Sequence, residues 1–250
     1  MWTYFLMLVS VATLIAVFVH RYMAEKKLAA MPATPPEDIF SDEEEMQEGE
    51  KKKISKGDKK LIEEYLEKAD VKIKVGKEDE AIKFLVQILA MDEFHQEAQH
   101  KLAMLYMQKQ MFSAASALFK QLCAQTDEAV HYSHLGLALY QQNEFDGAKQ
   151  AYQRAVILDP SRPQRFVSLG QVYRSLGQLN HALMAINKAM EIDQENMDFL
   201  FLTADIQKDL GNLKEAGEIV ERILVLQPDS EHAKELKKEI KKLSTEQEQK

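Results

Sequence analysis

Histidine pairs are the residues in this sequence whose spacing comes nearest to a metal site or a catalytic centre. His131 and His134 lie three residues apart, and His95 and His100 lie five apart. Neither pair has a third ligand at the spacing that a zinc site requires. The sequence also lacks the motifs of zinc peptidases, serine hydrolases, dinucleotide-binding proteins and phosphate-binding loops. We therefore expect no catalytic residue, no metal site and no cofactor, and ordinary polar roles for the histidines.

Charge and cysteine content exclude further classes of function. The chain has 250 residues, of which 46% are hydrophobic, and a net charge of −8. An acidic chain lacks the basic surface that phosphate contacts require, so we expect no nucleic-acid partner. Cys123 is the only cysteine, which excludes an intrachain disulfide, and we expect it to be buried as a small hydrophobe.

The elements that position these side chains are visible in residues 163–196, where the pattern is that of two packed helices. Phe166, Leu169, Gly170 and Tyr173 share one face of a first helix, and Ala182, Ile186 and Ala189 share one face of a second. The small residues Gly170 and Ala182 allow the two helices to approach closely. A glycine between the helices, Gly177, supplies the turn.

This pattern recurs along the chain at intervals of about 34 residues, with one residue missing near Thr126. The recurring positions are Tyr65, Ala69, Gly76, Ala81, Leu85, Ile88; Leu102, Ala103, Tyr106, Ala115, Phe119, Leu122; Tyr132, Leu135, Gly136, Leu139, Ala148, Tyr152, Ala155, Pro160; and Leu200, Ala204, Gly211, Ala216, Val220, Ile223, Pro228. Polar residues depart from the pattern at Lys68, Lys72, Thr203 and Gln207. Almost no run of residues is typical of a strand, so the pattern predicts an all-α fold.

These positions resemble the tetratricopeptide repeat (TPR) family, whose unit is a helix-turn-helix of this length. The resemblance covers five units within residues 58–230, near 62–95, 96–128, 129–162, 163–196 and 197–230. It implies a right-handed α-solenoid, in which each unit buries its apolar face against the next. In residues 231–250, Ala233, Leu236, Ile240 and Leu243 lie on one helical side, which predicts a capping helix followed by a frayed tail.

The N-terminal residues predict a membrane anchor. Residues 2–19 carry no charge and would span about 27 Å as a helix, close to the thickness of a bilayer core. We expect a transmembrane signal-anchor helix over residues 1–22. His20, Arg21, Lys26 and Lys27 follow it, so the N-terminus is expected outside and the repeats in the cytoplasm, at the inner (plasma) membrane. Residues 23–57, with an acidic run and three prolines, predict a disordered linker.

The resemblance to the repeat family also implies a concave groove, lined by the first helix of each unit, that binds a peptide or helix of a partner. The residues at groove positions are His100, Lys101, Met104, Met107, Gln108, Ser133, His134, Leu137, Tyr140, Gln141, Val167, Gln171, Arg174, Phe201 and Asp205. Leu137 and Leu202 could instead pack between neighbouring helices and take no part in lining the groove. The Lys and Asn residues of the carboxylate clamp that chaperone-binding relatives use do not occur at the matching positions.

We interpret the chain as a membrane-anchored protein-interaction scaffold or adaptor of bacterial type, and not as an enzyme. Its partners would be proteins or peptides, and the membrane through the N-terminal helix. Two alternatives remain: an accessory subunit of a membrane enzyme, or part of an envelope-assembly machine with the repeats on the extracytoplasmic side. Self-association through exposed apolar grooves or through the ends of the solenoid is a further possibility.

Overall fold

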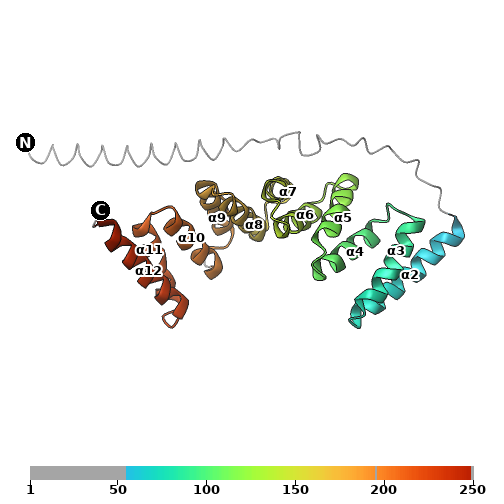
Figure 1. Ribbon diagram of the computed structural model, residues 1–250, viewed down its shortest axis with the longest axis horizontal. Coiled ribbons are helices and arrows are strands. Elements are labelled where there is room, and N and C mark those ends of the chain that lie inside the picture. The colour runs from blue at the N-terminus through green and yellow to red at the C-terminus, as the bar shows by residue number, and fades with distance from the viewer. Residues whose placement is uncertain (1–54, 195, 249–250) are drawn as a thin grey trace, which may run out of the picture. The chain divides into compact units, whose positions relative to one another are not determined.

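The computed structural model describes residues 55–194 and 196–248, which form eleven α-helices joined by short turns (Figure 1). The helices are α2 Lys56–Lys74, α3 Glu78–Met91, α4 Gln96–Gln108, α5 Phe112–Gln125, α6 Ala129–Gln141, α7 Phe145–Leu158, α8 Pro163–Ser175, α9 Leu179–Ile192, α10 Met197–Asp209, α11 Leu213–Leu226 and α12 Glu231–Glu248. These residues contain no strand. The prediction of an all-α helical repeat fold is therefore confirmed.

The predicted anchor helix and nearly all of the predicted linker lie outside the described residues. Within residues 55–194 and 196–248, no helix has both the length and the apolar character needed to cross a bilayer. Helix α2 begins at Lys56, just inside the predicted linker, because Ser55 and Asp58 cap it. The Asp58 backbone N–H donates to Ser55 Oγ at 3.1 Å, and the Ser55 backbone N–H donates to the Asp58 carboxylate at 3.3 Å.

Each helix packs mainly against its neighbours in the sequence, so the buried core is a seam that runs from unit to unit (Figure 1). The close approach of paired helices depends on small residues. A side chain at Gly170 would put its Cβ 2.6 Å from Ile186 Cδ1, and one at Gly136 would lie 2.8 Å from the Tyr152 ring. The small positions in the sequence pattern thus mark helix-helix contacts.

A left-handed backbone conformation recurs between the two helices of every unit. The φ angles are 72° at Gly76, 58° at Gln110, 61° at Asn143, 69° at Gly177 and 79° at Gly211. The interval from Gln110 to Asn143 is one residue shorter than the others, as expected from the missing residue near Thr126. Glycine adopts this conformation without cost, whereas Gln110 and Asn143 hold it at some strain.

Residues that depart from the repeat pattern find specific partners. Lys68 Nζ lies 5.6 Å from the centre of the Tyr65 ring and 5.8 Å from that of Phe84, so its chain covers the aromatic pair. Thr203 is buried and donates its hydroxyl to Phe199 O at 2.7 Å. A polar residue is therefore tolerated at these positions because its polar atoms are satisfied or reach the surface.

Helix α12 covers the last repeat. Ser230 caps the helix by accepting a hydrogen bond from the Ala233 N–H at 3.3 Å. Ala233, Leu236 and Ile240 are buried in one cluster with residues of α10 and α11, and the other side of the helix is rich in exposed Lys and Glu. This is the arrangement that an end of a repeat array needs to stay soluble.

Candidate functional site

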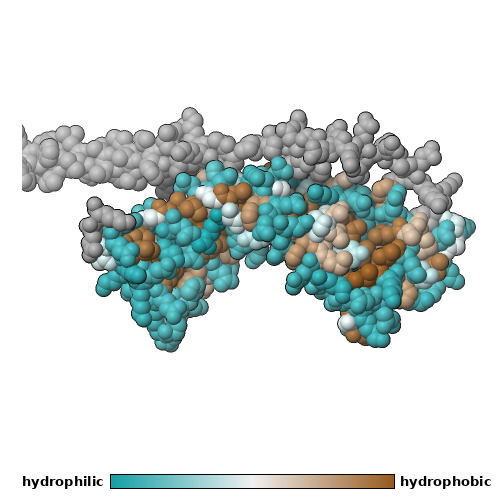
Figure 2. All heavy atoms as spheres, in the orientation of Figure 1, coloured by the Kyte–Doolittle hydropathy of each residue, from teal (hydrophilic) through white to brown (hydrophobic). Residues whose placement is uncertain are grey.

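The residues predicted to line the groove lie on α4, α6, α8 and α10, the first helices of units two to five. We call the surface formed by α2, α4, α6, α8, α10 and α12 the first-helix face. None of the predicted residues is fully buried, and Leu137 keeps 39% of its surface exposed. On the side shown in Figure 2, hydrophobic residues form a patch over α4, one of these first helices. The face is therefore accessible in part, and its individual residues differ in what they contact.

Polar contacts tie most consecutive first helices together. Lys101 of α4 pairs with Asp70 of α2, and Arg174 of α8 donates to Asp209 of α10 at 2.8 Å. Further contacts join α6 to α8 and α10 to α12. These are Ser133 with Arg165 at 3.1 Å, Tyr140 with Ser175 at 3.2 Å, and Lys208 with Glu239 at 3.0 Å. Lys101, Ser133 and Arg174, predicted as partner-binding residues, thus already serve to join repeats.

The apolar residues of the prediction divide into packed and exposed members. Met104, Met107 and Val167 are half-buried against the main core, and so is Leu202. Phe201 stacks on the His232 ring of α12 with 4.4 Å between ring centres. Leu137 is the exception because it remains exposed on α6. Of the two leucines for which packing between helices was the alternative, Leu202 packs and Leu137 does not.

A pocket of about 480 Å³ lies between α6 and α8. It is lined by Val130, Ser133, His134 and Leu137 of α6 and by Tyr152 of α7. The other side is formed by Arg162, which precedes α8, and by Gln164, Arg165 and Ser168 of α8. Val130 and Leu137 are each 39% exposed and supply its apolar wall. The pocket therefore offers a concave surface in which an apolar side chain of a partner would lose contact with water. We call it the α6/α8 pocket.

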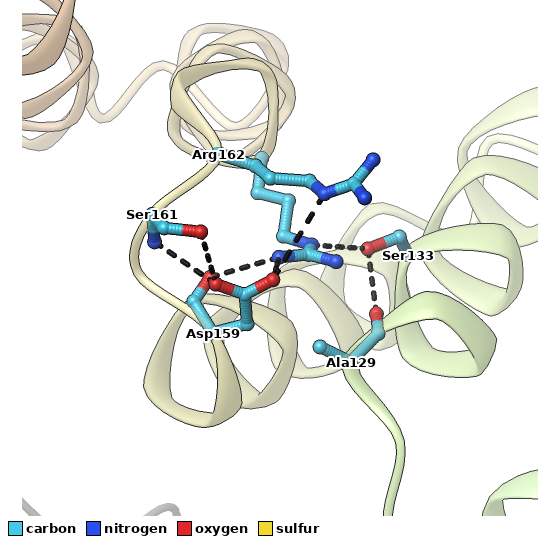
Figure 3. Close-up of polar contacts among 6 residues, drawn as sticks. Ala129, Ser133, Asp159, Ser161 and Arg162 are labelled. Carbon is cyan, nitrogen blue, oxygen red and sulfur yellow. Dashed lines mark hydrogen bonds and ion pairs between the residues drawn. The ribbon is translucent and has the colours of Figure 1, made fainter.

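Two arginines lie near the turn between α7 and α8 (Figure 3). Arg162 precedes α8 and is exposed, whereas Arg165 lies in the first turn of α8 and is buried. The Asp159 carboxylate accepts from Ser161 Oγ at 2.5 Å and from the Ser161 N–H at 3.0 Å, and it pairs with Arg165. These bonds, that of the Ser161 hydroxyl first, hold the pKa of Asp159 well below its ordinary value. Ser133, which donates to Ala129 O at 2.7 Å, accepts from Arg165 Nε. Arg165 is buried and neutralised by this network.

Arg162 is the arginine whose charge reaches solvent at the pocket mouth. Its side chain is 73% exposed, and its Nε lies 4.0 Å from the nearest Asp159 oxygen, so the ion pair is weak. His134 forms another part of the wall and is uncharged at neutral pH, since burial and the neighbouring His100 and His131 lower its pKa to about 4. The α6/α8 pocket thus combines apolar walls with one accessible positive charge.

Sequence reasoning missed several residues of this pocket. Arg162, Gln164 and Arg165 were not predicted because they lie in the turn and first turn of α8, outside the positions carried over from the repeat family. The succession of Asp159, Pro160, Ser161, Arg162 and Pro163 contained a signal, since Asp followed by Ser two residues later is typical of a side-chain-bonded turn. Only the structure shows that this turn opens onto α6.

Some of the histidines make the ordinary polar contacts that the sequence predicts. His95 caps α4 by accepting from the Ala98 N–H at 3.2 Å, and His131 Nδ1 lies 2.9 Å from Thr126 Oγ1. Within residues 55–194 and 196–248, no group of three or more His, Cys, Asp or Glu residues is placed to hold a metal ion. Cys123 is buried, as predicted, and burial raises the pKa of its thiol to about 12.

Comparison with known proteins identifies the repeats. Models of the tetratricopeptide repeat match residues 129–162 and 164–196. A search of curated proteins found no match. The chain therefore contains tetratricopeptide repeats, and the predicted resemblance is confirmed for its central units. Proteins built from such repeats are generally non-enzymatic scaffolds that bind protein or peptide partners.

Solved structures show the same fold. A crystal structure of MamA protein aligns with a TM-score of 0.64 and 25% identity, over 66% of this chain and 90% of that one. YrrB, described as a TPR protein with an unusual peptide-binding site, aligns with a TM-score of 0.64 and 24% identity, over 72% and 97%. A tetratricopeptide repeat protein from Parabacteroides merdae reaches a TM-score of 0.68 at 15% identity, over 74% of each chain.

Proposed function

We propose that this chain is an adaptor that binds a segment of a partner protein on its first-helix face, with the α6/α8 pocket as the anchoring point. The observation that carries the proposal is the pocket itself, which places exposed Val130 and Leu137 beside the accessible charge of Arg162. Elsewhere on the face many polar side chains are already engaged in contacts between repeats. A partner therefore gains most by occupying this pocket.

The chemistry of the pocket defines the segment that fits it. Apolar walls favour an aliphatic or aromatic side chain, and the Arg162 guanidinium favours a carboxylate one or two residues away from it. Arg165 adds no free charge because Asp159 neutralises it. The partner segment would thus carry an apolar residue next to Asp, Glu or a C-terminal carboxylate.

Membrane anchoring is a further part of the proposed function. It is supported by the uncharged residues 2–19 and by the basic residues that follow them. With the repeats in the cytoplasm at the inner membrane, as in anchored adaptors of bacterial type, tethering would raise the local concentration of a bound partner without a need for tight binding. A reporter fused after Lys250 tests this orientation, since activity of a periplasmic reporter such as alkaline phosphatase would contradict it.

Site-specific photocrosslinking in native membranes tests the binding site. A photoreactive residue replaces Leu137 in the pocket or, as a control, Ile157 on α7, which is 45% exposed and also apolar. We expect a discrete adduct from position 137 alone, and we expect Arg162→Glu to abolish it while Arg162→Lys retains it. Equal labelling from both positions, or an adduct that is indifferent to Arg162→Glu, would refute the assignment.

A further inference from the structure

Three histidines meet where α4 lies beside α6. The His100 ring centre is 5.5 Å from that of His131 and 5.5 Å from that of His134. The His134 ring also stacks on Phe119 of α5, with 5.3 Å between centres and 22° between planes. We call His100, His131 and His134 the histidine cluster. His131 is buried and the other two rings are half-buried. Water therefore cannot fully solvate the positive charge that a ring gains when it is protonated.

The polar atoms of the cluster favour neutral rings. His131 Nδ1 is satisfied by Thr126, whereas His100 Nδ1 is buried and has no hydrogen-bond partner among the described residues. Burial lowers the pKa of all three rings, and the lowering is largest for His134. No carboxylate is paired with any of the three rings in the described part of the chain.

The charged groups around the cluster only partly offset one another. On α4, Lys101 opposes protonation of His100; in the connection before α6, Glu128 favours protonation of His100 and His131. On α8, Arg162 and Arg165 share the α6/α8 pocket with His134 and add positive charge on that side. From α5 the cluster meets the uncharged ring of Phe119.

The histidine cluster lies at the step between first helices that differs from the others in its side-chain contacts. The steps from α2 to α4, α6 to α8, α8 to α10 and α10 to α12 are each held by a hydrogen bond or ion pair between side chains. Between α4 and α6, the structure shows histidine rings in contact, and the hydrogen bonds and ion pairs of residues 55–194 and 196–248 include none that joins these two helices.

We propose that the histidine cluster makes the step from α4 to α6 a pH-sensitive joint, closed when the rings are neutral and opened when two of them are protonated. Two positive rings about 5.5 Å apart repel each other, and protonation also requires water that the closed joint excludes. Because the closed joint disfavours proton binding, a fall in pH below about 6.5, the ordinary value for histidine, shifts the equilibrium toward the open form. This joint exists whether or not the first-helix face binds a partner.

Cys123 provides a native reporter of the opening. It is the only cysteine in the chain, it is 5% exposed, and it lies on α5 in the same buried cluster as Tyr132 of α6. A disulfide reagent that works in mild acid, such as dithiodipyridine, labels the thiol only when this packing opens. For the full-length chain, we expect the labelling rate, divided by that of a small free thiol at the same pH, to rise at least tenfold from pH 7.5 to 5.0.

Matched variants separate the cluster from general acid effects. His134→Phe removes a titrating ring but keeps an aromatic on Phe119, and it should reduce the rise to less than threefold. His181→Phe is the control, because His181 is exposed on α9 and likewise stacks on an aromatic, Tyr173, at 5.3 Å. The control should retain the full rise. No rise in the unaltered protein, or an equal rise in His134→Phe, would overturn the proposal.

Nuclear magnetic resonance of the histidine side chains tests the proposal without any variant of the cluster. The chain has seven histidines. We expect the ring signals of His100, His131 and His134 to titrate below the ordinary range of histidine and to broaden or split as the joint opens. If all seven titrate together near 6.5, the rings are not held neutral by the fold and the joint does not exist.

Discussion

At the residue scale, the turn between the two helices of a unit reveals which positions depend on glycine. Three of the five left-handed residues are Gly, and the others are Gln110 and Asn143. Asparagine tolerates this region far better than glutamine because its short polar side chain can bond to the local backbone. The cost of the non-glycine turns should therefore be greater in unit two than in unit three.

Replacing these two residues by glycine tests that difference. Gln110→Gly should stabilise the protein by about 0.5 to 1 kcal/mol, because the strain of a positive φ is removed at a solvent-exposed position. Asn143→Gly should change the stability by less than about 0.5 kcal/mol. Urea unfolding followed by circular dichroism measures both. A larger gain at position 143 would show that the strain is distributed differently.

Glycines inside helices should respond in opposite directions to alanine. Gly170→Ala would place its Cβ 2.6 Å from Ile186, and we expect a loss of about 1 to 3 kcal/mol from overpacking. A Cβ at Gly217 of α11 would meet no atom within 4 Å, so Gly217→Ala should instead stabilise by about 0.5 to 1 kcal/mol through helix propensity. Denaturant midpoints of the two variants should shift to opposite sides of the unaltered protein.

At the element scale, α12 closes the apolar end of the solenoid. Leu236 is 4% exposed and belongs to the cluster that α12 forms with α10 and α11. Leu236→Ala should cost about 2 to 5 kcal/mol in the stability of this end, whereas Lys238→Ala on the exposed side should change it by less than about 0.5 kcal/mol. Hydrogen exchange should show the loss in α10 and α11 first. Uniform loss across all helices would mean that the array unfolds as one unit.

The helices themselves could be predicted from the sequence because periodicity carries the necessary information. The buried position of Ile186 recurs in every unit, and Gly177 marks its turn as predicted. The capping helix also follows from its apolar stripe. What periodicity cannot supply is the fate of a polar side chain on the surface, since Lys101 and Arg174 have partners more than 30 residues away.

The candidate site was predictable only in outline for the same reason. The family pattern identified Ser133, His134 and Leu137 as groove positions, and the structure places them together in the α6/α8 pocket. It could not identify Arg162 or Arg165, because their proximity to α6 depends on the path of the turn after α7. Nor could spacing along the chain bring His100 to His134, which meet only through the packing of α4 beside α6.

At the scale of the whole molecule, the pH dependence of stability follows from the buried histidines. The pKa of His134 is lowered to about 4 in the folded protein, so the unfolded chain binds more protons between about pH 4 and 6.5. Stability should therefore be constant above about pH 6.5 and fall by about 1 to 3 kcal/mol as the pH decreases toward 4. Thermal unfolding across this range measures the loss, and His134→Phe should reduce it, leaving the part that His100 and His131 contribute. An increase in stability on acidification would contradict the sign.

A repeat array suits the role of an adaptor because its face is assembled from units that differ in detail. Each first helix contributes a few residues, and ties such as Arg174 with Asp209 fix the helices relative to one another. Most polar side chains of the first-helix face therefore hold the repeats together, while Leu137 and Arg162 remain exposed to a partner beside one pocket. Binding should depend on that pocket far more than on the number of repeats.

The most direct measurement is the affinity of the captured partner segment for purified protein, compared between two substitutions. Leu137→Asp places a charge in the α6/α8 pocket, and Ile157→Asp places the same charge on a similarly exposed apolar site of α7. We predict at least a tenfold loss of affinity for Leu137→Asp and less than a twofold change for Ile157→Asp, by calorimetry on folded samples. Equal effects, or a loss confined to Ile157→Asp, would show that the partner binds elsewhere.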